Sequence, residues 1–382
     1  MIGITEPVRA ARLELAIVAI AAAAAELDRE PRFPREAFEE LAAAGALSAT
    51  IGAARDGASV APEWNLLRRV AAADASVGRV LDGHLNAVER LEVAAEPEVR
   101  DRELAAVEAG GRLLGVWGAD PRGDEGAPAR LHETDDGLVL RGAKTFCSGA
   151  GGVDAAMVMV GNDDGAAPAL VLLDCGEAVE VDRDWYRAAG LRASESHRVV
   201  FHDAPVTAVL GGPGELARDP WFSRDAMRTA ATWAGMVDAA AEATLDVLVA
   251  AGRGEDALAQ LAAGRIEAAR GTVDAWLARA AMVADAAIRP SAAAPTLGAL
   301  VDGDHSLGSC MAGDPRATSI AMRAEIDRAA KAILETAASA CGSHPFVTAG
   351  RLDRARRDLE TFLLQHRLDP LLVRLGGERL SR

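Results

Sequence analysis

Aromatic residues are scarce in this sequence: they make up 4% of 382 residues, although half of all residues are hydrophobic. Alanine, leucine and valine must therefore supply much of the core. Basic residues are also in deficit, because 41 lysines and arginines stand against 57 acidic residues and the formal net charge is −16. A surface for nucleic acid or an anionic membrane needs clustered positive charge, so this balance argues against both partners.

Cysteine occurs only four times, with no CxxC pair, so the sequence predicts buried reduced thiols and neither a metal site nor a disulfide framework. Long apolar runs are missing as well. Leu15–Ala25 follows Arg9 and Arg12 and loosely resembles a signal peptide, but Glu14 and its many alanines favour a surface helix. The run is also too short for a bilayer, which takes about 20 residues. We expect a cytoplasmic protein without a membrane segment.

The pattern of apolar residues changes twice along the chain. Residues 1 to about 110 show helical spacing, with Pro34 suited to a first helical turn and Gly45 to a helix end. Helical spacing returns after about 212. The long alanine-rich segments of this last part are typical of a helical bundle. They cover residues 222–250, 255–287, 316–341 and 351–367.

Between these parts, short β-type runs alternate with turns rich in glycine, aspartate and proline. The runs are Leu113–Trp117, Ala129–Glu133, Leu138–Phe146, Ala155–Val160, Ala169–Asp174 and Arg198–His202. Asp135-Asp136-Gly137 is a hairpin signal, and no GxGxxG motif follows a strand, which argues against a Rossmann domain. The sequence predicts an α+β fold in three domains: N-terminal helices over 1–110, an antiparallel β-domain over 111–212, and a C-terminal bundle over 213–382.

Three motifs occur in a fixed order along this arrangement. They are Gly115–Pro121 with Gly137–Gly149, then Gly190–Asp203, then Cys341–Pro345 with Arg351–Asp358. In these motifs the sequence resembles the acyl-CoA dehydrogenase superfamily, and the resemblance runs over nearly the whole chain. It implies a helical domain, a β-domain and a helical bundle, with a flavin between the sheet domain and the bundle.

The resemblance also assigns flavin contacts. By position, Trp117, Ala119 and Asp120 would lie in the loop along the flavin rim. Phe146 matches the aromatic residue that packs on the ring, and Ser148 matches the hydroxyl residue that hydrogen-bonds near flavin N5. Read without the resemblance, Phe146 is a core aromatic on a strand and Ser148 an ordinary turn residue.

The catalytic base departs from the family pattern. The dehydrogenases remove a thioester α-proton with a glutamate nine residues after the position of Arg357, where this chain has His366. Other members carry the glutamate ten residues before a helix glycine, and counting from Gly235 reaches Asp225. Asp225 and Arg228 also resemble the family pair that contacts the CoA end of the substrate. The two assignments of Asp225 remain alternatives.

A histidine at this position is shared with flavin monooxygenases of the same fold. In those monooxygenases a neutral imidazole can stabilise an oxygenated flavin or deprotonate a phenol. In the same framework, His84 and Arg192 are candidates to face the substrate mouth. The competing interpretation is a helix-cap role for His84 and a β-corner role for Arg192.

The FAD signature is altered as well. Where the family has RxQFG, this chain keeps Arg253 but places Glu255 and Asp256 beside it, and carboxylates are unfavourable near a pyrophosphate. The glycine turn at Gly342 lacks its second glycine. We expect FAD with Arg253 and Gly342 as contacts, and FMN as the alternative.

Three functions follow from the resemblance. The leading one is a flavin-dependent oxidoreductase that acts on the CH–CH bond of a CoA- or carrier-bound acyl thioester, with an electron-transfer flavoprotein as a possible partner. The first alternative is a two-component monooxygenase that obtains reduced flavin from a flavin reductase and uses His366 on an aromatic substrate. The second is a non-catalytic subunit or binding module. Helices apolar on more than one face predict a homodimer or homotetramer.

Overall fold

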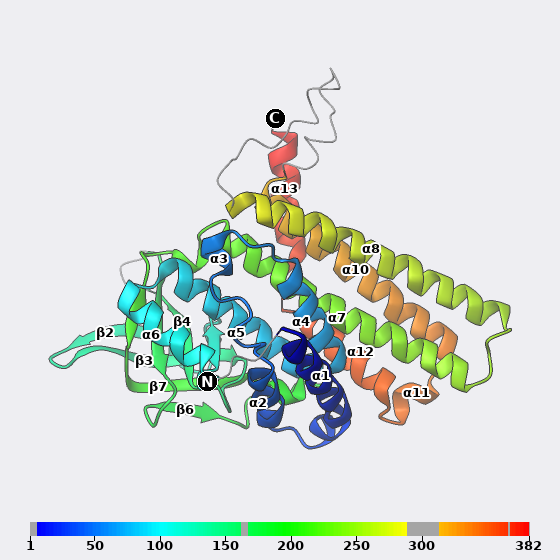
Figure 1. The fold of residues 1–382 in the computed structure, drawn as a ribbon, viewed down its shortest axis with the longest axis horizontal. Helices are drawn as coiled ribbons and strands as arrows, with labels where there is room; N and C mark the ends of the chain where they lie inside the picture. The colour runs from blue at the N-terminus through cyan, green and yellow to red at the C-terminus, as the bar shows by residue number, and fades with distance from the viewer. Residues whose placement is uncertain (1–5, 162–166, 289–312, 366, 382) are drawn as a thin grey trace. The chain divides into compact units, whose positions relative to one another are not determined.

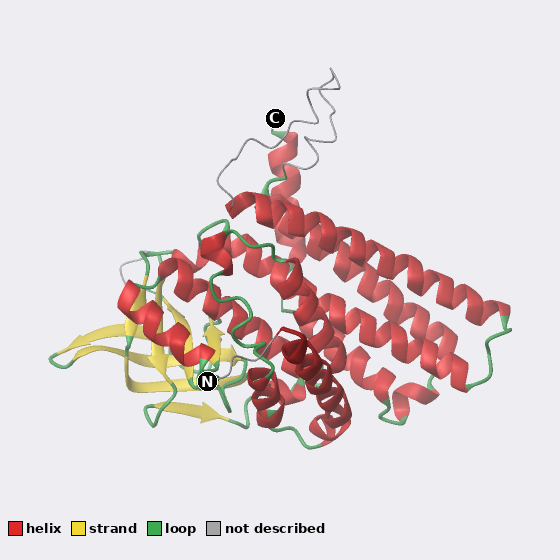
Figure 2. Ribbon diagram, viewed as in Figure 1, coloured by secondary structure: helices red, strands yellow, loops and turns green. Residues whose placement is uncertain are grey.

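The computed structural model describes residues 6–161, 167–288, 313–365 and 367–381. The chain forms two compact units. The first consists of residues 1–56 and 73–218, and the second of residues 57–72 and 219–382. Helices, strands and again helices follow one another along the chain, which confirms the predicted α+β fold. Figure 2 distinguishes the helices from the strands by colour.

The first unit begins with helices. They are α1 (Glu6–Arg29), α2 (Arg35–Ala43), α3 (Ala53–Asp56), α5 (Ala75–Ala94) and α6 (Pro97–Glu108). As expected, α2 begins directly after Pro34 and ends before Gly45, whose φ of +75° suits a helix end. The Asp74 carboxylate caps α5 by accepting a hydrogen bond from the Val77 N–H at 2.9 Å.

Two four-stranded sheets complete the first unit. One has the order β1 (Leu114–Trp117), β4 (Ala155–Val160), β5 (Ala169–Asp174) and β8 (Ala208–Leu210). The other has the order β2 (Arg130–Thr134), β3 (Gly137–Cys147), β7 (His197–Pro205) and β6 (Val179–Asp182). Thr134 pairs with Gly137, so β2 and β3 form the predicted hairpin (Figure 1).

The prediction of an entirely antiparallel domain is wrong for one strand pair. β1 and β4 run parallel, with Leu114 opposite Ala155 and Trp117 opposite Val158. The segment that joins them, 118–154, contains both strands of the β2–β3 hairpin. It is long enough to return the chain to the same end of the sheet, as a parallel pair requires. The remaining pairs are antiparallel.

The second unit is helical. Its helices are α4 (Ala61–Ala73), α7 (Trp221–Ala250), α8 (Ala257–Ile288), α10 (Pro315–Cys341), α11 (His344–Val347), α12 (Arg351–Leu363) and α13 (Leu368–Leu380). The long helices α7, α8 and α10 pack against one another (Figure 1). Trp233 of α7 meets Phe362 of α12 edge to face, with ring centroids 6.1 Å apart.

Helix α4 joins this unit although it precedes the sheets in sequence. A Cβ on Gly235 of α7 would lie 2.1 Å from the Arg68 carbonyl oxygen, so only glycine allows the backbones this close. The Arg68 guanidinium pairs with Asp238 at 2.6 Å. The compact units therefore divide the chain elsewhere than at 110 and 212, and the three-domain division stays a prediction, as does the homo-oligomer.

Membrane-spanning helices and metal-binding clusters are both absent from the described residues. No described helix combines the length and apolarity needed to cross a membrane. Within those residues, no cluster of histidine, cysteine, aspartate or glutamate could hold a metal ion. Cys147, Cys175 and Cys341 are free thiols there, whereas Cys310 lies outside the described residues.

Candidate functional site

Phe146 is displayed by an irregularity in β3. The pairing of β3 with β7 shifts register between Lys144 and Cys147. Phe146 lies within this shift and has a φ of +52°, a left-handed conformation that bulky residues rarely adopt. Its side chain is 59% exposed, while the neighbouring Thr145 and Cys147 are buried. Such local strain is typical of functional sites.

A second aromatic ring extends this exposed surface. Trp185 meets Phe146 edge to face, with centroids 4.9 Å apart and ring planes at 84°. The Trp185 indole N–H donates to the Glu125 carboxylate at 3.1 Å. The two rings and the hydrogen bond form a fixed aromatic surface that can pack against a planar ligand.

Ser148 lies two residues beyond Phe146 and is buried. Its hydroxyl oxygen is 2.9 Å from the Ser196 hydroxyl, which is 2.8 Å from that of Ser194. The Ser194 hydroxyl donates to the Leu191 carbonyl at 2.7 Å. Ser148 therefore belongs to a row of hydroxyls that joins the end of β3 to the start of β7.

Trp117 does not present its ring to an open site. The side chain is fully buried and packs against Phe201, with centroids 6.4 Å apart. Its indole N–H donates to the Ser148 carbonyl at 3.1 Å. The Trp117 ring lies on an inward-facing position of β1, where it supports the Ser148 backbone. The place of Trp117 in a loop along the flavin stays a prediction.

Ala119 and Asp120 are exposed, as a rim loop requires. The Thr145 N–H donates to the Ala119 carbonyl at 3.0 Å. The Asp120 carboxylate accepts from the Lys144 ammonium at 2.6 Å, and Lys144 is only 1% exposed. A buried ammonium needs such a partner. These contacts hold the loop beside the residues that precede Phe146.

His84 is enclosed by the protein, and its expected contact with substrate stays a prediction. It is fully buried on α5. One ring nitrogen, Nδ1, accepts from the Leu114 N–H at 3.1 Å, and Nε2 donates to the Leu47 carbonyl at 2.9 Å. Burial lowers the pKa of His84 to about 4. A neutral imidazole thus connects α5 to β1 and to the turn after α2.

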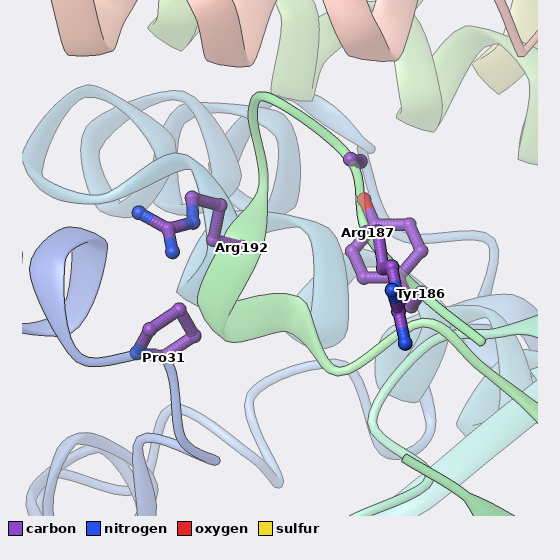
Figure 3. Close-up of a pocket in the computed structure, with 5 residues that line it drawn as sticks. Pro31, Tyr186, Arg187 and Arg192 are labelled. Atoms are coloured by element: carbon purple, nitrogen blue, oxygen red, sulfur yellow. The ribbon is translucent and has the colours of Figure 1, made fainter. Parts of the chain in front are cut away.

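Arg192 lines a small pocket of about 260 Å³ in the first unit. The lining residues are Pro31, Tyr186, Arg187, Ala188 and Arg192. Figure 3 shows Arg192 and Pro31 on one side and Tyr186 and Arg187 on the other. The Arg192 guanidinium also donates to the Asp28 carbonyl, which ties the η1 turn (Arg192–Ser194) to the end of α1. Its substrate role stays a prediction.

His197 and Glu195 lie close together in the structure, although no sequence motif pairs them. His197 is buried beside Tyr186, and burial lowers its pKa. Its Nε2 is 4.0 Å from the Glu195 carboxylate, which accepts from Arg183 at 2.8 Å. Nδ1 of His197 has no hydrogen-bond partner among the described residues. The left-handed φ of Glu195, +42°, produces this pairing, and sequence motifs do not reveal that conformation.

In the second unit, Arg228 is buried and paired within the protein. Its side chain is 1% exposed and forms an ion pair with Glu63 of α4. A second contact, at 3.4 Å, joins it to the Asp225 carboxylate, which is 26% exposed. The guanidinium is thus paired with two carboxylates of its own chain, and the expected contact between Arg228 and a CoA group stays a prediction.

Arg253 is likewise engaged within the protein. It donates to Asp256 at 2.9 and 3.1 Å and to the Ala340 carbonyl at the end of α10. The hydrogen bond from Arg253 lowers the pKa of Asp256. Gly342 ends α10 with a φ of +68°. Arg253 thus stabilises the turn between α7 and α8. Its expected contact with a cofactor stays a prediction.

His366 lies outside the described residues, so its position stays a prediction. The described residues bring together Phe146, Ser148, Ala119 and Asp120 in the first unit. Asp225, Arg253 and Gly342 belong to the second unit.

The chain has recognisable relatives, although no protein-family model matches it. It is 31% identical over 300 residues to an L-evernosamine nitrososynthase from Micromonospora sp., covering 68% of this chain and 67% of the relative. It is 29% identical over 209 residues to a dibenzothiophene monooxygenase from Rhodococcus erythropolis. That match covers 50% of this chain and 48% of the relative, so the chain spans about half the length of these monooxygenases.

Solved structures show the same fold. The nitrososynthase from Micromonospora carbonacea var. africana is 25% identical, with a TM-score of 0.76 over 100% of this chain and 99% of that chain. The FMN-bound TdsC from Paenibacillus sp. A11-2 is 18% identical, with a TM-score of 0.78 over 97% of each chain. The motifs, the fold and these relatives agree, and the chain belongs to the flavin monooxygenase branch of the acyl-CoA dehydrogenase-like superfamily.

Proposed function

We propose that this protein is the oxygenase component of a two-component flavin monooxygenase. It would take reduced flavin from a separate reductase and transfer one oxygen atom of O₂ to a small organic substrate, while the other oxygen leaves as water and the flavin is oxidised. The observation that carries the proposal is the exposed ring of Phe146, which stands on a left-handed backbone two residues before the buried Ser148.

The chemistry of these residues fits an isoalloxazine. The exposed ring of Phe146 and the half-buried ring of Trp185 offer an apolar surface, and Ser148, two residues beyond Phe146, carries a hydroxyl. The exposed loop at Ala119 and Asp120 adds backbone polar groups. When bound, reduced flavin would supply the electrons that activate O₂. The residues of this chain would hold the ring, exclude water and manage protons around it.

Two residues of the second unit, Arg228 and Asp225, argue against acyl-CoA dehydrogenation, which is the leading interpretation of the sequence. That reaction needs a carboxylate base and a contact for the CoA end of the substrate. Arg228 is buried against Glu63, and Asp225 lies 3.4 Å from the Arg228 guanidinium. The relatives named above are a monooxygenase and a nitrososynthase. Both observations favour the monooxygenase alternative.

We propose FMN rather than FAD as the flavin. The family's FAD contact corresponds to Arg253, which is occupied by Asp256 and the Ala340 carbonyl. The Asp256 carboxylate beside Arg253 adds a negative charge, which is unfavourable for a pyrophosphate at this turn. FMN lacks the adenylate half, so it needs no contact with this turn. The related TdsC structure contains FMN.

The names of the relatives suggest a substrate class. One relative is named for dibenzothiophene, an aromatic sulfur compound, and another for L-evernosamine, an amino sugar. We propose a small substrate that carries an electron-rich sulfur, nitrogen or aromatic carbon. His366 is proposed as the group that moves or holds a proton at that atom, because it occupies the position of the family's base.

Anaerobic titration tests the proposal. The protein is mixed with photoreduced FMN, and then with air and indole as a probe, because a TdsC structure contains indole. We expect FMN binding and an indole product heavier by one oxygen atom. Reduction of FMN by an acyl-CoA without a reductase would instead support the dehydrogenase, and failure to bind FMN in either redox state would support the non-catalytic interpretation.

A further inference from the structure

Three buried serines form a continuous row in the first unit. The hydroxyl oxygens of Ser148 and Ser196 are 2.9 Å apart, and those of Ser196 and Ser194 are 2.8 Å apart. The residues are 9%, 5% and 0% exposed, so water competes little for these bonds. Because each serine hydroxyl has only one proton, the direction of each bond determines the direction of the next.

The row has a defined end. The Ser194 hydroxyl lies 2.7 Å from the Leu191 carbonyl, which can only accept. Ser194 uses its proton there and can only accept from Ser196. Ser196 then donates to Ser194 and can only accept from Ser148. Ser148 must therefore point its proton into the protein, which leaves its oxygen lone pairs for any other partner.

The backbone that carries the row is held in place. Leu191 and Glu195 both have left-handed φ values, +54° and +42°, on either side of the η1 turn. The Glu195 carboxylate accepts from Arg183 at 2.8 Å, and the Gly149 N–H donates to the Ser194 carbonyl at 2.8 Å. These contacts fix Ser194 and Ser196, and hydrogen bonds in such a chain strengthen one another.

We infer that this row makes Ser148 an acceptor-only group that selects the reduced form of the flavin. The inference rests on the proposed function. Flavin N5 is a lone-pair acceptor in the oxidised ring but carries a hydrogen, and so donates, in the reduced ring. An acceptor-only Ser148 therefore satisfies reduced flavin and opposes a lone pair to oxidised flavin. Ser194 and Ser196 are positioning residues that act through Ser148.

This selection suits an enzyme that receives reduced flavin from another protein and must release the oxidised form. One hydrogen bond gained or lost changes a dissociation constant by about five- to tenfold. We therefore expect Kd for oxidised FMN to exceed Kd for reduced FMN by about this factor. A tenfold ratio equals a shift of about 30 mV in the midpoint potential of the bound flavin.

Both dissociation constants are to be measured for the wild type and for three variants. Ser196→Ala removes the acceptor of the Ser148 proton, which can then turn outward, so the ratio should fall about five- to tenfold. Ser194→Ala frees the Ser196 proton to point at Ser148 and should lower the ratio in the same direction. Ser48→Ala is the matched control, because its hydroxyl donates to Gly45 within its own turn, and should leave the ratio unchanged.

The ratio of the two dissociation constants distinguishes selection of reduced FMN from a purely structural role of the serines. Equal loss of affinity for both redox forms in Ser196→Ala and Ser194→Ala would overturn the inference, as would an unchanged ratio. If Ser196→Ala does not fold, as judged by circular dichroism, Ser194→Ala decides alone. A wild type that binds both forms equally would refute the selection but leave the proposed function standing, whereas a wild type that binds neither would refute both.

Discussion

Arg228 of α7 and Glu63 of α4 form an ion pair in which both side chains are buried, 1% and 7% exposed. The pair connects a helix from the first part of the chain to the first helix of the bundle. Two charges removed from water are tolerated only together.

Loss of the Glu63 charge should therefore be costly. We expect Glu63→Ala to lower the free energy of unfolding by about 3–5 kcal/mol, because it leaves the Arg228 charge less compensated. Urea denaturation measures this. As a control, Glu242→Ala removes a half-exposed partner of Arg270 and should cost less than about 1 kcal/mol. Similar losses in both variants would contradict the argument.

Stability should fall in acid because of His84. Its folded pKa, about 4, lies below the ordinary value of 6.5, so the unfolded chain binds the proton more tightly. The contribution is complete above pH 6.5 and is lost as the pH falls toward 4. We expect about 2 kcal/mol of loss between pH 7 and pH 5 from this residue. His84→Gln cannot titrate, so its urea midpoint should vary less with pH than that of the wild type.

Phe146 should matter for flavin and little for folding. Its ring is mostly exposed, so Phe146→Ala removes few core contacts. We expect about tenfold weaker FMN binding, measured by quenching of flavin fluorescence, because an aromatic contact contributes about 1 kcal/mol. Phe222→Ala, which removes another exposed ring, should leave FMN affinity unchanged. Equal affinity in both variants would remove Phe146 from the proposed site.

Two helix glycines should respond oppositely to alanine. A Cβ on Gly235 would overlap the Arg68 carbonyl, so Gly235→Ala should destabilise the protein by about 1–3 kcal/mol. Gly264 in α8 has no atom within 4 Å of its added Cβ. Gly264→Ala should raise stability by up to about 1 kcal/mol, because alanine favours the helix. Thermal unfolding of both variants checks the sign.

The proposed proton-transfer role of His366 makes a separate prediction. His366→Ala should retain FMN but lose about 10²–10⁴-fold in oxygenation rate. The control is His202→Ala, because that exposed histidine pairs with Glu180 at a strand edge. If Asp225→Ala is inactive while His366→Ala remains active, the base lies on α7 instead.

Local patterns of apolar residues were sufficient to predict most of the strands and the long helices. All six predicted runs overlap observed strands, namely β1, β2, β3, β4, β5 and β7, and the long bundle segments correspond to α7, α8, α10 and α12. The strands β6 (Val179–Asp182) and β8 (Ala208–Leu210) were missed because they are short and take their stability from neighbours. The parallel pairing of β1 was missed for a similar reason, since strand direction depends on a distant partner.

The sequence by itself determined the order of helices and strands, the hairpin at Asp135–Gly137 and the family motifs, because these depend on spacing between near neighbours. Only the tertiary structure decided which motif residues remain open to a ligand. His84 and Leu47 are 37 residues apart, and Arg228 and Glu63 are 165 apart. Burial and hydrogen-bond direction at such residues arise from contacts between distant segments, and a linear pattern carries no record of those contacts.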